Sequence, residues 1–278
     1  MRDTKIFEQR IKYMIRNTKR KISFYTSEKL SVFETIHHFF STRNHGVSKG
    51  IFSSLNFGTH HGELSNMKKN LELLASSFQV GTERFVIPVQ THSDHIEVVD
   101  ETNVNLQFEN IDALITNTPG ITIAVKTADC VPVLLFDPMT DCIAAIHVGW
   151  RGTAKNIVGK TIEKMKITFG TNPKNLIASI GPCISMKNYE VGMDVIDQIQ
   201  QAFPYSTDAS FFTVINSEKA LLDLSQVNFE LLKQAGVQGK NIEKSNLCTF
   251  SEKEDFFSAR RDGPITGRML SGITIIIK

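Results

Sequence analysis

The stretch of sequence that decides the fold runs from Thr127 to Gly152 and reads TADCVPVLLFDPMTDCIAAIHVGWRG. Two apolar runs, at 131–136 and 142–147, are separated by the polar residues 137–141, which include Pro138. Short apolar runs bounded by turn-forming residues predict β-strands, and a short connection between two of them predicts an antiparallel hairpin. The centre of the chain is therefore predicted to be a buried β-hairpin.

This predicted hairpin brings a thiol and an imidazole together. Cys130 precedes Met139, the centre of the turn, by nine residues, and His147 follows it by eight. Because partners in an antiparallel hairpin lie at equal distances from the turn, Cys130 and His147 are expected to be neighbours at one end. Side chains alternate along a strand, so His147 shares a face with Ile143, whereas Cys142 lies on the other face and is expected to be an ordinary core residue.

The rest of the chain alternates between short β-branched runs and a few helical stretches. Strands are predicted at 37–42, 85–90, 113–116, 121–126, 131–136, 142–147, 176–180 and 272–277. Helices are predicted at 66–78, at 153–169 with Gly170 as the stop, and from the N-cap Asp223 to about Gly236. Strands and helices are interspersed without a strict βαβ rhythm. This pattern favours an α/β (α+β) fold with a mixed β-sheet core flanked by helices.

Composition indicates a globular protein without a strong charge preference. Of the 278 residues 41% are hydrophobic, and the formal net charge of +2 is too small to predict a nucleic acid or a membrane as partner. Four cysteines without a CxxC pair, and no secretory signal or membrane-length apolar run, predict a cytoplasmic protein with free thiols. Residues 1–30 contain a basic cluster and are predicted to form an N-terminal extension, which leaves 31–278 as one catalytic domain.

A third candidate metal ligand, His92, follows the strand predicted at 85–90, in a position where functional side chains are often mounted. One cysteine and two histidines suit zinc, and a catalytic zinc keeps three protein ligands with an open fourth position. The spacing alone leaves the ordinary alternative open, in which Cys130 is an inert buried thiol and each histidine simply forms a hydrogen bond.

Seven short segments of the chain resemble those of a known family. They are FSTR at 40–43, SSLNFG at 53–58, QTH at 90–92, TADC at 127–130, HVGWRG at 147–152, GPCIS at 181–185 and FSARRD at 257–262. In this order they resemble the YfiH/YlmD-type laccase-domain family, whose members are named polyphenol oxidases, peptidoglycan editing factors or purine nucleoside phosphorylases. The resemblance runs from Phe33 to the C-terminus. One departure is Ser93, where the family usually has glycine.

The resemblance implies a metal site and an activity. It implies that His92, Cys130 and His147 bind zinc, in a fold similar to a toxin-deamidase catalytic domain that uses a Cys–His pair. The implied reaction is phosphorolysis of adenosine, inosine, guanosine and S-methyl-5'-thioadenosine, with adenosine deaminase activity alongside. The partners would be a purine nucleoside and phosphate, and the chain a monomer or homodimer. Asp129, beside Cys130, is a candidate acid/base or a partner that orients His147.

Phosphorolysis also needs an anion pocket and contacts to the nucleoside. A guanidinium group matches phosphate with a planar fork, which makes Arg43, Arg151 and Arg260 the candidates, each with a structural ion pair as the alternative. Asn56 and Gln90 are candidate polar contacts to the substrate.

Three rival functions remain open from the sequence. A copper-dependent, laccase-like polyphenol oxidase needs several HxH pairs to hold a copper cluster, whereas this chain has eight histidines and no HxH. A metal-free hydrolase or amidase that edits peptidoglycan precursors would use Cys130 as nucleophile and His147 as base. A metal or nucleotide sensor would bind its ligand without turnover. An open three-ligand site favours catalysis.

Overall fold

The predicted hairpin forms the centre of a six-stranded sheet in the computed structural model, which describes residues 14–19, 22–202 and 211–277. The hairpin strands are β8 (Val131–Asp137) and β9 (Cys142–Val148), and Pro132 pairs with His147. The sheet order is β14-β10-β8-β9-β6-β5. The outer strands are β14 (Ile242–Lys244), β10 (Ile177–Ile180), β6 (Ala113–Thr116) and β5 (Ile96–Val98). The prediction of an antiparallel hairpin is confirmed.

A second six-stranded sheet has the order β1-β2-β3-β15-β7-β4. Its strands are β1 (Met14–Lys19), β2 (Ile22–Ser27), β3 (Ile36–Ser41), β15 (Met269–Ile275), β7 (Thr122–Thr127) and β4 (Phe85–Val86). In each sheet most pairs are antiparallel, but β4 with β7, β5 with β6 and β10 with β14 are parallel. The prediction of a mixed β-sheet core is confirmed.

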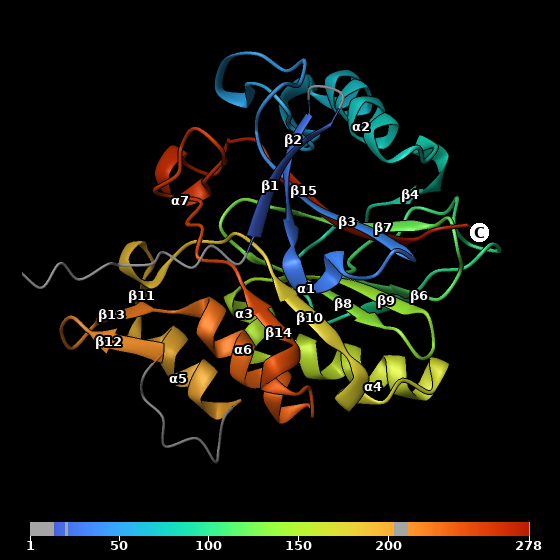
Figure 1. The fold of residues 1–278 in the computed structure, drawn as a ribbon. Helices are drawn as coiled ribbons and strands as arrows, with labels where there is room; N and C mark the ends of the chain where they lie inside the picture. Colours follow the sequence, from blue (N-terminus) through green and yellow to red (C-terminus); the bar gives the residue numbers. More distant parts are fainter. Residues whose placement is uncertain (1–13, 20–21, 203–210, 278) are drawn as a thin grey trace, which may run out of the picture.

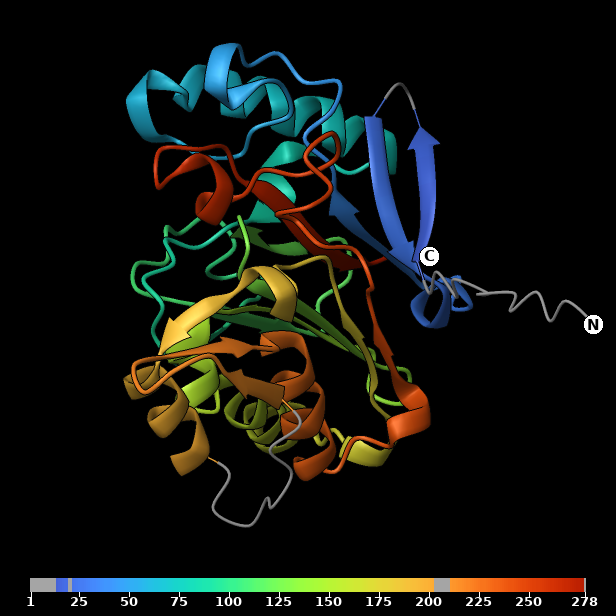
Figure 2. The same cartoon turned by 90° about the vertical axis from the view of Figure 1, so that its left-hand side faces the viewer.

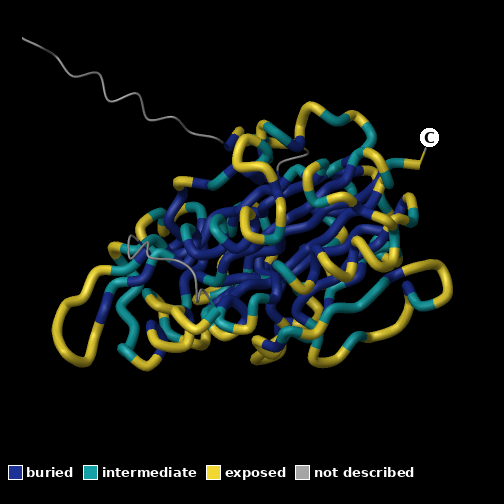
Figure 3. Tube along the Cα trace, turned by 90° about the horizontal axis from the view of Figure 1, so that it is seen from below, coloured by how far each residue is buried: buried dark blue, intermediate teal, exposed yellow. Residues whose placement is uncertain are grey.

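The two sheets pack face to face and helices cover their outer sides (Figures 1 and 2). Ile123 and Val125 of β7 share one buried cluster with Leu134 of β8 and Ile143 of β9, which places this cluster between the sheets. Figure 3 shows this interior as buried strands surrounded by exposed loops. The other face of β9, which includes Cys142, packs against the helices below it, as predicted for an ordinary core residue.

The helices follow the predictions closely at their ends. α2 (Leu64–Phe78) covers the second sheet, and α6 (Leu224–Gln234) begins at Asp223, whose side chain accepts the backbone N–H of Gln226. The helix predicted at 153–169 is instead two helices, α3 (Trp150–Ala154) and α4 (Ile157–Phe169). The break occurs at Asn156, which has a left-handed backbone and caps α4 by accepting the N–H of Gly159.

Smaller elements complete the fold. They are the helices α1 (Glu28–Ser31), α5 (Met193–Gln201) and α7 (Ala259–Asp262), and a three-stranded sheet of β11 (Glu190–Gly192), β13 (Lys219–Leu222) and β12 (Phe212–Val214). Among the described residues, no helix is long and apolar enough to cross a membrane.

The segment predicted as a basic N-terminal extension, residues 1–30, is in its described part a piece of the second sheet. β1 and β2 form a hairpin, and β2 pairs with β3 through Phe24 and Tyr25. The physical reason is that β2 is buried on both faces, Ile22 and Phe24 in one apolar cluster and Tyr25 in another. Residues 14–19 and 22–27 are therefore strands of the second sheet and not a separate extension, while residues 1–13, 20 and 21 lie outside the described part of the chain.

A buried histidine in β3 makes the stability of this sheet sensitive to acid. His38 is 4% exposed, and its Nε2 accepts the backbone N–H of Ser27 at 2.8 Å. Burial lowers the pKa of His38 from 6.5 to about 4. In the unfolded chain His38 takes up a proton near pH 6.5, but in the folded chain only near pH 4. Its contribution to the free energy of unfolding is therefore fully present above pH 6.5 and is lost as the pH falls from 6.5 to 4.

We predict that the free energy of unfolding decreases by about 3 kcal/mol between pH 6.5 and pH 4 because of His38. Urea titrations at a series of pH values measure this decrease. The variant His38→Gln, which cannot titrate, should show a correspondingly flatter profile. An identical pH profile in the two proteins would contradict this role of His38.

Candidate metal centre and catalytic cavity

Three side chains from different parts of the chain converge at one end of the central hairpin. The donor atoms of His92, Cys130 and His147 all lie within 4.8 Å of one another. Cys130 Sγ lies 3.8 Å from His92 Nε2, and the two imidazole rings lie 4.9 Å apart at 73°. A Cβ added to Gly149 would approach His92 Cδ2 to 2.8 Å, so this close packing requires glycine. The predicted proximity of Cys130 and His147 is confirmed, and His92 joins them.

A buried carboxylate that the sequence did not reveal holds two of these three residues. Asp112, directly before β6, is fully buried, and its Oδ1 lies 2.6 Å from His147 Nδ1. The same carboxylate accepts the backbone N–H groups of Thr91, His92 and Ser93 at 2.7–3.1 Å. Asp112 therefore fixes both the ring of His147 and the loop that carries His92. With Nδ1 engaged, Nε2 of His147 is left to bind a metal.

Ser93 strengthens this arrangement. Its hydroxyl group donates to Asp112 Oδ2 at 2.7 Å, in addition to its backbone N–H. A glycine at this position would have no hydroxyl group to make this bond. His92 has a positive φ of 61°, so the chain turns sharply here and three consecutive N–H groups reach one carboxylate.

The charges around Cys130 favour its thiolate. Burial raises the pKa of the thiol, but the charge and hydrogen bonds of His147 and His92 outweigh burial and lower the pKa to about 6. Burial likewise lowers the pKa of His147, but Cys130 and Asp112 outweigh it and raise the pKa to about 9. One thiolate and two imidazole nitrogens at this spacing are a donor set that suits a tetrahedral metal ion.

Asp129, predicted as an acid/base or as the partner that orients His147, is turned elsewhere. Its carboxylate accepts the hydroxyl groups of Thr249 (2.6 Å) and Ser258 (3.0 Å) and the backbone N–H of Arg260 (2.7 Å). The orienting partner of His147 is Asp112, so that part of the prediction was wrong. Since Asp129 is buried beside Cys130, these bonds tie the loop at 249–260 to the metal centre.

Three predicted substrate contacts bind the backbone of neighbouring segments instead, a strand in the case of Gln90 and loops in the other two. The side-chain amide of Gln90 pairs with both the N–H and the C=O of Lys126, at 2.7 and 2.8 Å. Asn56 Oδ1 accepts two backbone N–H groups, and Arg43 Nε donates to the C=O of Ser53 while its guanidinium stacks on a phenylalanine ring. Among the described residues that line the cavity at the metal centre, Arg43, Asn56 and Gln90 are absent.

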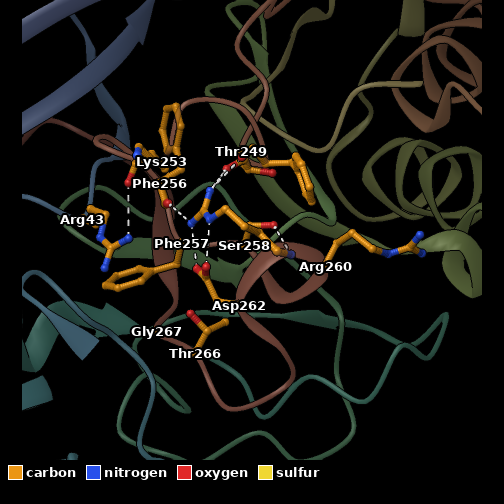
Figure 4. Close-up of polar contacts among 12 residues, drawn as sticks. Arg43, Thr249, Lys253, Phe256, Phe257, Ser258, Arg260, Asp262, Thr266 and Gly267 are labelled. Atoms are coloured by element: carbon orange, nitrogen blue, oxygen red, sulfur yellow. Dashed lines mark hydrogen bonds and ion pairs between the residues drawn. The ribbon is translucent and has the colours of Figure 1, made fainter. Parts of the chain in front are cut away.

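The cavity beside the metal centre has a volume of about 270 Å³. Arg151 and Arg260, both predicted, line it, and each guanidinium stacks on an aromatic ring that also lines it: Arg151 on Trp150 at 4.2 Å and Arg260 on Tyr189 at 5.2 Å. Figure 4 shows Arg260 and Arg43 on opposite sides of the loop at 249–260. Further wall residues are Ala128, Asp129, Gly149, Ile184, Leu224 and Ala259, beside the ligands His92 and Cys130.

We predict that Asp112→Asn weakens metal binding by about 10–100-fold, because an amide cannot hold the neutral ring of His147 as a carboxylate does. Competition with a chromophoric chelator measures this affinity. Asp129→Asn is the matched control, since Asp129 is also buried near the site but has no recorded hydrogen bond to a ligand ring. Equal losses in both variants would show that charge alone, and not the bond to His147, supports the metal.

The chain is similar to known proteins over most of its length. The family model described as multi-copper polyphenol oxidoreductase laccase matches residues 37–276. A purine nucleoside phosphorylase of Bacteroides thetaiotaomicron is 36% identical over 271 residues, which cover 94% of this chain and 98% of the relative. A protein named adenosine deaminase, from an unknown prokaryotic organism, is 34% identical over 86% of this chain and 94% of its own length.

Solved structures show the same fold. YlmD from Geobacillus stearothermophilus superposes with a TM-score of 0.88 at 28% identity, covering 96% of this chain and all of that one. A hypothetical protein YfiH from Bacillus licheniformis gives a TM-score of 0.85 at 33% identity, covering 91% of this chain and 96% of that one. The fold, the family match and the relatives agree, and the chain belongs to the YfiH/YlmD-type laccase-domain family.

Proposed function

We propose that this protein is a zinc-dependent purine nucleoside phosphorylase with adenosine deaminase activity. The observation that carries the proposal is the His92–Cys130–His147 cluster, which opens into a cavity with two arginines. The names of the relatives support it, since several are named purine nucleoside phosphorylases and one an adenosine deaminase. The proposed substrates are adenosine, inosine, guanosine and S-methyl-5'-thioadenosine together with phosphate. We place the reaction in the cytoplasm, in a monomer or homodimer.

Zinc is the metal that the donor set favours. Thiolate and imidazole ligands in a three-residue site are typical of catalytic zinc, whereas a multicopper cluster needs more histidines than this cavity offers. His92, Cys130 and His147 would hold the ion, with Asp112 behind His147. Zinc bound there would supply a Lewis acid at the wall of the cavity.

The two arginines are suited to the anionic co-substrate. In phosphorolysis, a phosphate oxygen bonds to the anomeric carbon of the sugar while the bond to the purine breaks. Arg260 is held in place by its Nη1, which donates to the C=O of Glu190 at 2.8 Å. The side chain of Arg151 stacks on Trp150 and has no recorded hydrogen bond to a described residue, which leaves its planar fork free for phosphate. Asp129 stays a candidate proton carrier, although three hydrogen bonds already occupy it.

The paired charges of Cys130 and His147 favour one alternative, a metal-free Cys–His hydrolase or amidase that edits peptidoglycan precursors. A thiol with a pKa of about 6 next to an imidazole with a pKa of about 9 also suits nucleophilic catalysis. A copper-dependent polyphenol oxidase is the second alternative, which rests on the description of the family model. A metal-free hydrolase would keep its activity in the presence of a chelator, whereas a zinc enzyme would lose it. Metal analysis would find copper in a polyphenol oxidase and zinc in the proposed enzyme.

The direct test supplies the purified protein with inosine and phosphate. We predict release of hypoxanthine and ribose 1-phosphate, loss of activity on treatment with a chelator, and recovery on addition of zinc. Cys130→Ala should abolish activity because it removes a metal ligand. Cys142→Ala is the matched control, since this thiol lies in the core, on the face of β9 opposite to His147. Activity that survives chelation or the Cys130→Ala change would contradict the proposal.

A further inference from the structure

Tyr189 is a polar side chain in the wall of the catalytic cavity. The side chain is half-buried in the cavity wall, between the short 3-10 helix Met186–Asn188 and β11. Its hydroxyl group has no recorded hydrogen bond to any residue that the structure describes. Tyr25 offers the contrast, because its buried phenol donates to Asp255 Oδ2 at 2.7 Å. Because no described residue occupies it, the hydroxyl group of Tyr189 is open to a ligand in the cavity.

The backbone of Tyr189 is held by two hydrogen bonds, and its ring packs against Arg260. Its backbone N–H donates to the C=O of Met186 at 3.1 Å, and its C=O accepts the N–H of Leu222 at 3.0 Å. Arg260 lies over the ring at 5.2 Å and is itself fixed on two sides, by Glu190 through its guanidinium and by Asp129 through its backbone. A phenol and a guanidinium group therefore form a rigid pair of donors on one wall.

The phenol is a donor and not a proton source. The ordinary pKa of a tyrosine phenol is about 10, and burial raises the pKa of Tyr189 further. The hydroxyl group therefore keeps its proton at neutral pH and donates a hydrogen bond. Because Arg260 covers one face of the ring, that face is closed to a stacked purine base, and a neighbouring cation and neutral donor together suit a ligand with several negatively charged oxygens.

We propose that Tyr189 donates a hydrogen bond to the phosphate co-substrate, beside Arg260, and thereby favours phosphorolysis over deamination. This inference rests on the proposed function and names a residue of the same site that no sequence motif indicated. In the reaction, a phosphate oxygen forms its bond to the anomeric carbon, and the electron pair of the broken carbon–nitrogen bond leaves with the purine, which takes up the proton that hydrogen phosphate loses. Tyr189 keeps its own proton and orients the attacking phosphate.

The variant Tyr189→Phe removes only the hydroxyl group. We expect the KM for phosphate in inosine phosphorolysis to rise about 10-fold, the loss typical of one hydrogen bond to a charged group. Deamination of adenosine, which needs no phosphate, should stay within about twofold of the wild type, and the metal content should be unchanged. Tyr25→Phe is the control, because it removes a phenol outside the cavity and should leave the KM for phosphate unchanged.

Two kinetic outcomes would overturn the proposal. Equal losses of phosphorolysis and deamination would place Tyr189 against the nucleoside or in the support of the metal centre, and an unchanged KM for phosphate would show that the phenol touches no phosphate.

A separate measurement covers failure of the proposed function itself. If the wild type performs no phosphorolysis, titration of the metal-loaded protein with inorganic phosphate in a calorimeter still tests the hydrogen bond from Tyr189 to phosphate. Phosphate binding that weakens about 10-fold in Tyr189→Phe supports this bond, and phosphate binding that is absent or unchanged overturns it.

Discussion

The metal centre depends on one buried carboxylate, that of Asp112. It accepts hydrogen bonds from Nδ1 of His147, from three consecutive backbone N–H groups and from the hydroxyl group of Ser93. A charge without solvent contact is stable only when such donors surround it, so the loop that carries His92 and the strand that carries His147 are locked together. Removing the carboxylate would take the acceptor from Nδ1 of His147 and from three backbone N–H groups, and would leave the Ser93 hydroxyl group only the C=O of Asn110.

A second set of hydrogen bonds connects this centre to the substrate cavity. Asp129, next to the ligand Cys130, holds the loop at 249–260 by three bonds, one of them to the backbone of Arg260. The guanidinium of Arg260 then lies over Tyr189. The two aspartates therefore have different roles: Asp112 positions the candidate metal ligands, and Asp129 positions the cavity wall. The His92–Cys130–His147 cluster and the wall that carries Arg260 are thereby held in a fixed relation.

The sequence predicted those parts of the site that follow from local rules. Antiparallel pairing depends only on distance from a turn, so it placed Cys130 beside His147 correctly. Asp112 was not predicted as a site residue because it lies 35 residues from His147 and belongs to no local pattern. Its position directly before a buried strand was a signal that could have been used. The segments that resemble the family did not predict contact with the cavity. Gln90 binds the backbone of strand β7, and Asn56 and Arg43 bind the backbone of loops. The N-terminal hairpin was missed because its apolar residues follow a basic cluster.

The central claim is that His92, Cys130 and His147 bind one zinc ion. X-ray absorption spectroscopy of the purified protein at the zinc edge tests it most directly. The claim predicts one zinc per chain, with one sulfur ligand at about 2.3 Å and two imidazole nitrogens at about 2.0–2.1 Å. A zinc shell without sulfur, or several copper ions per chain, would contradict it.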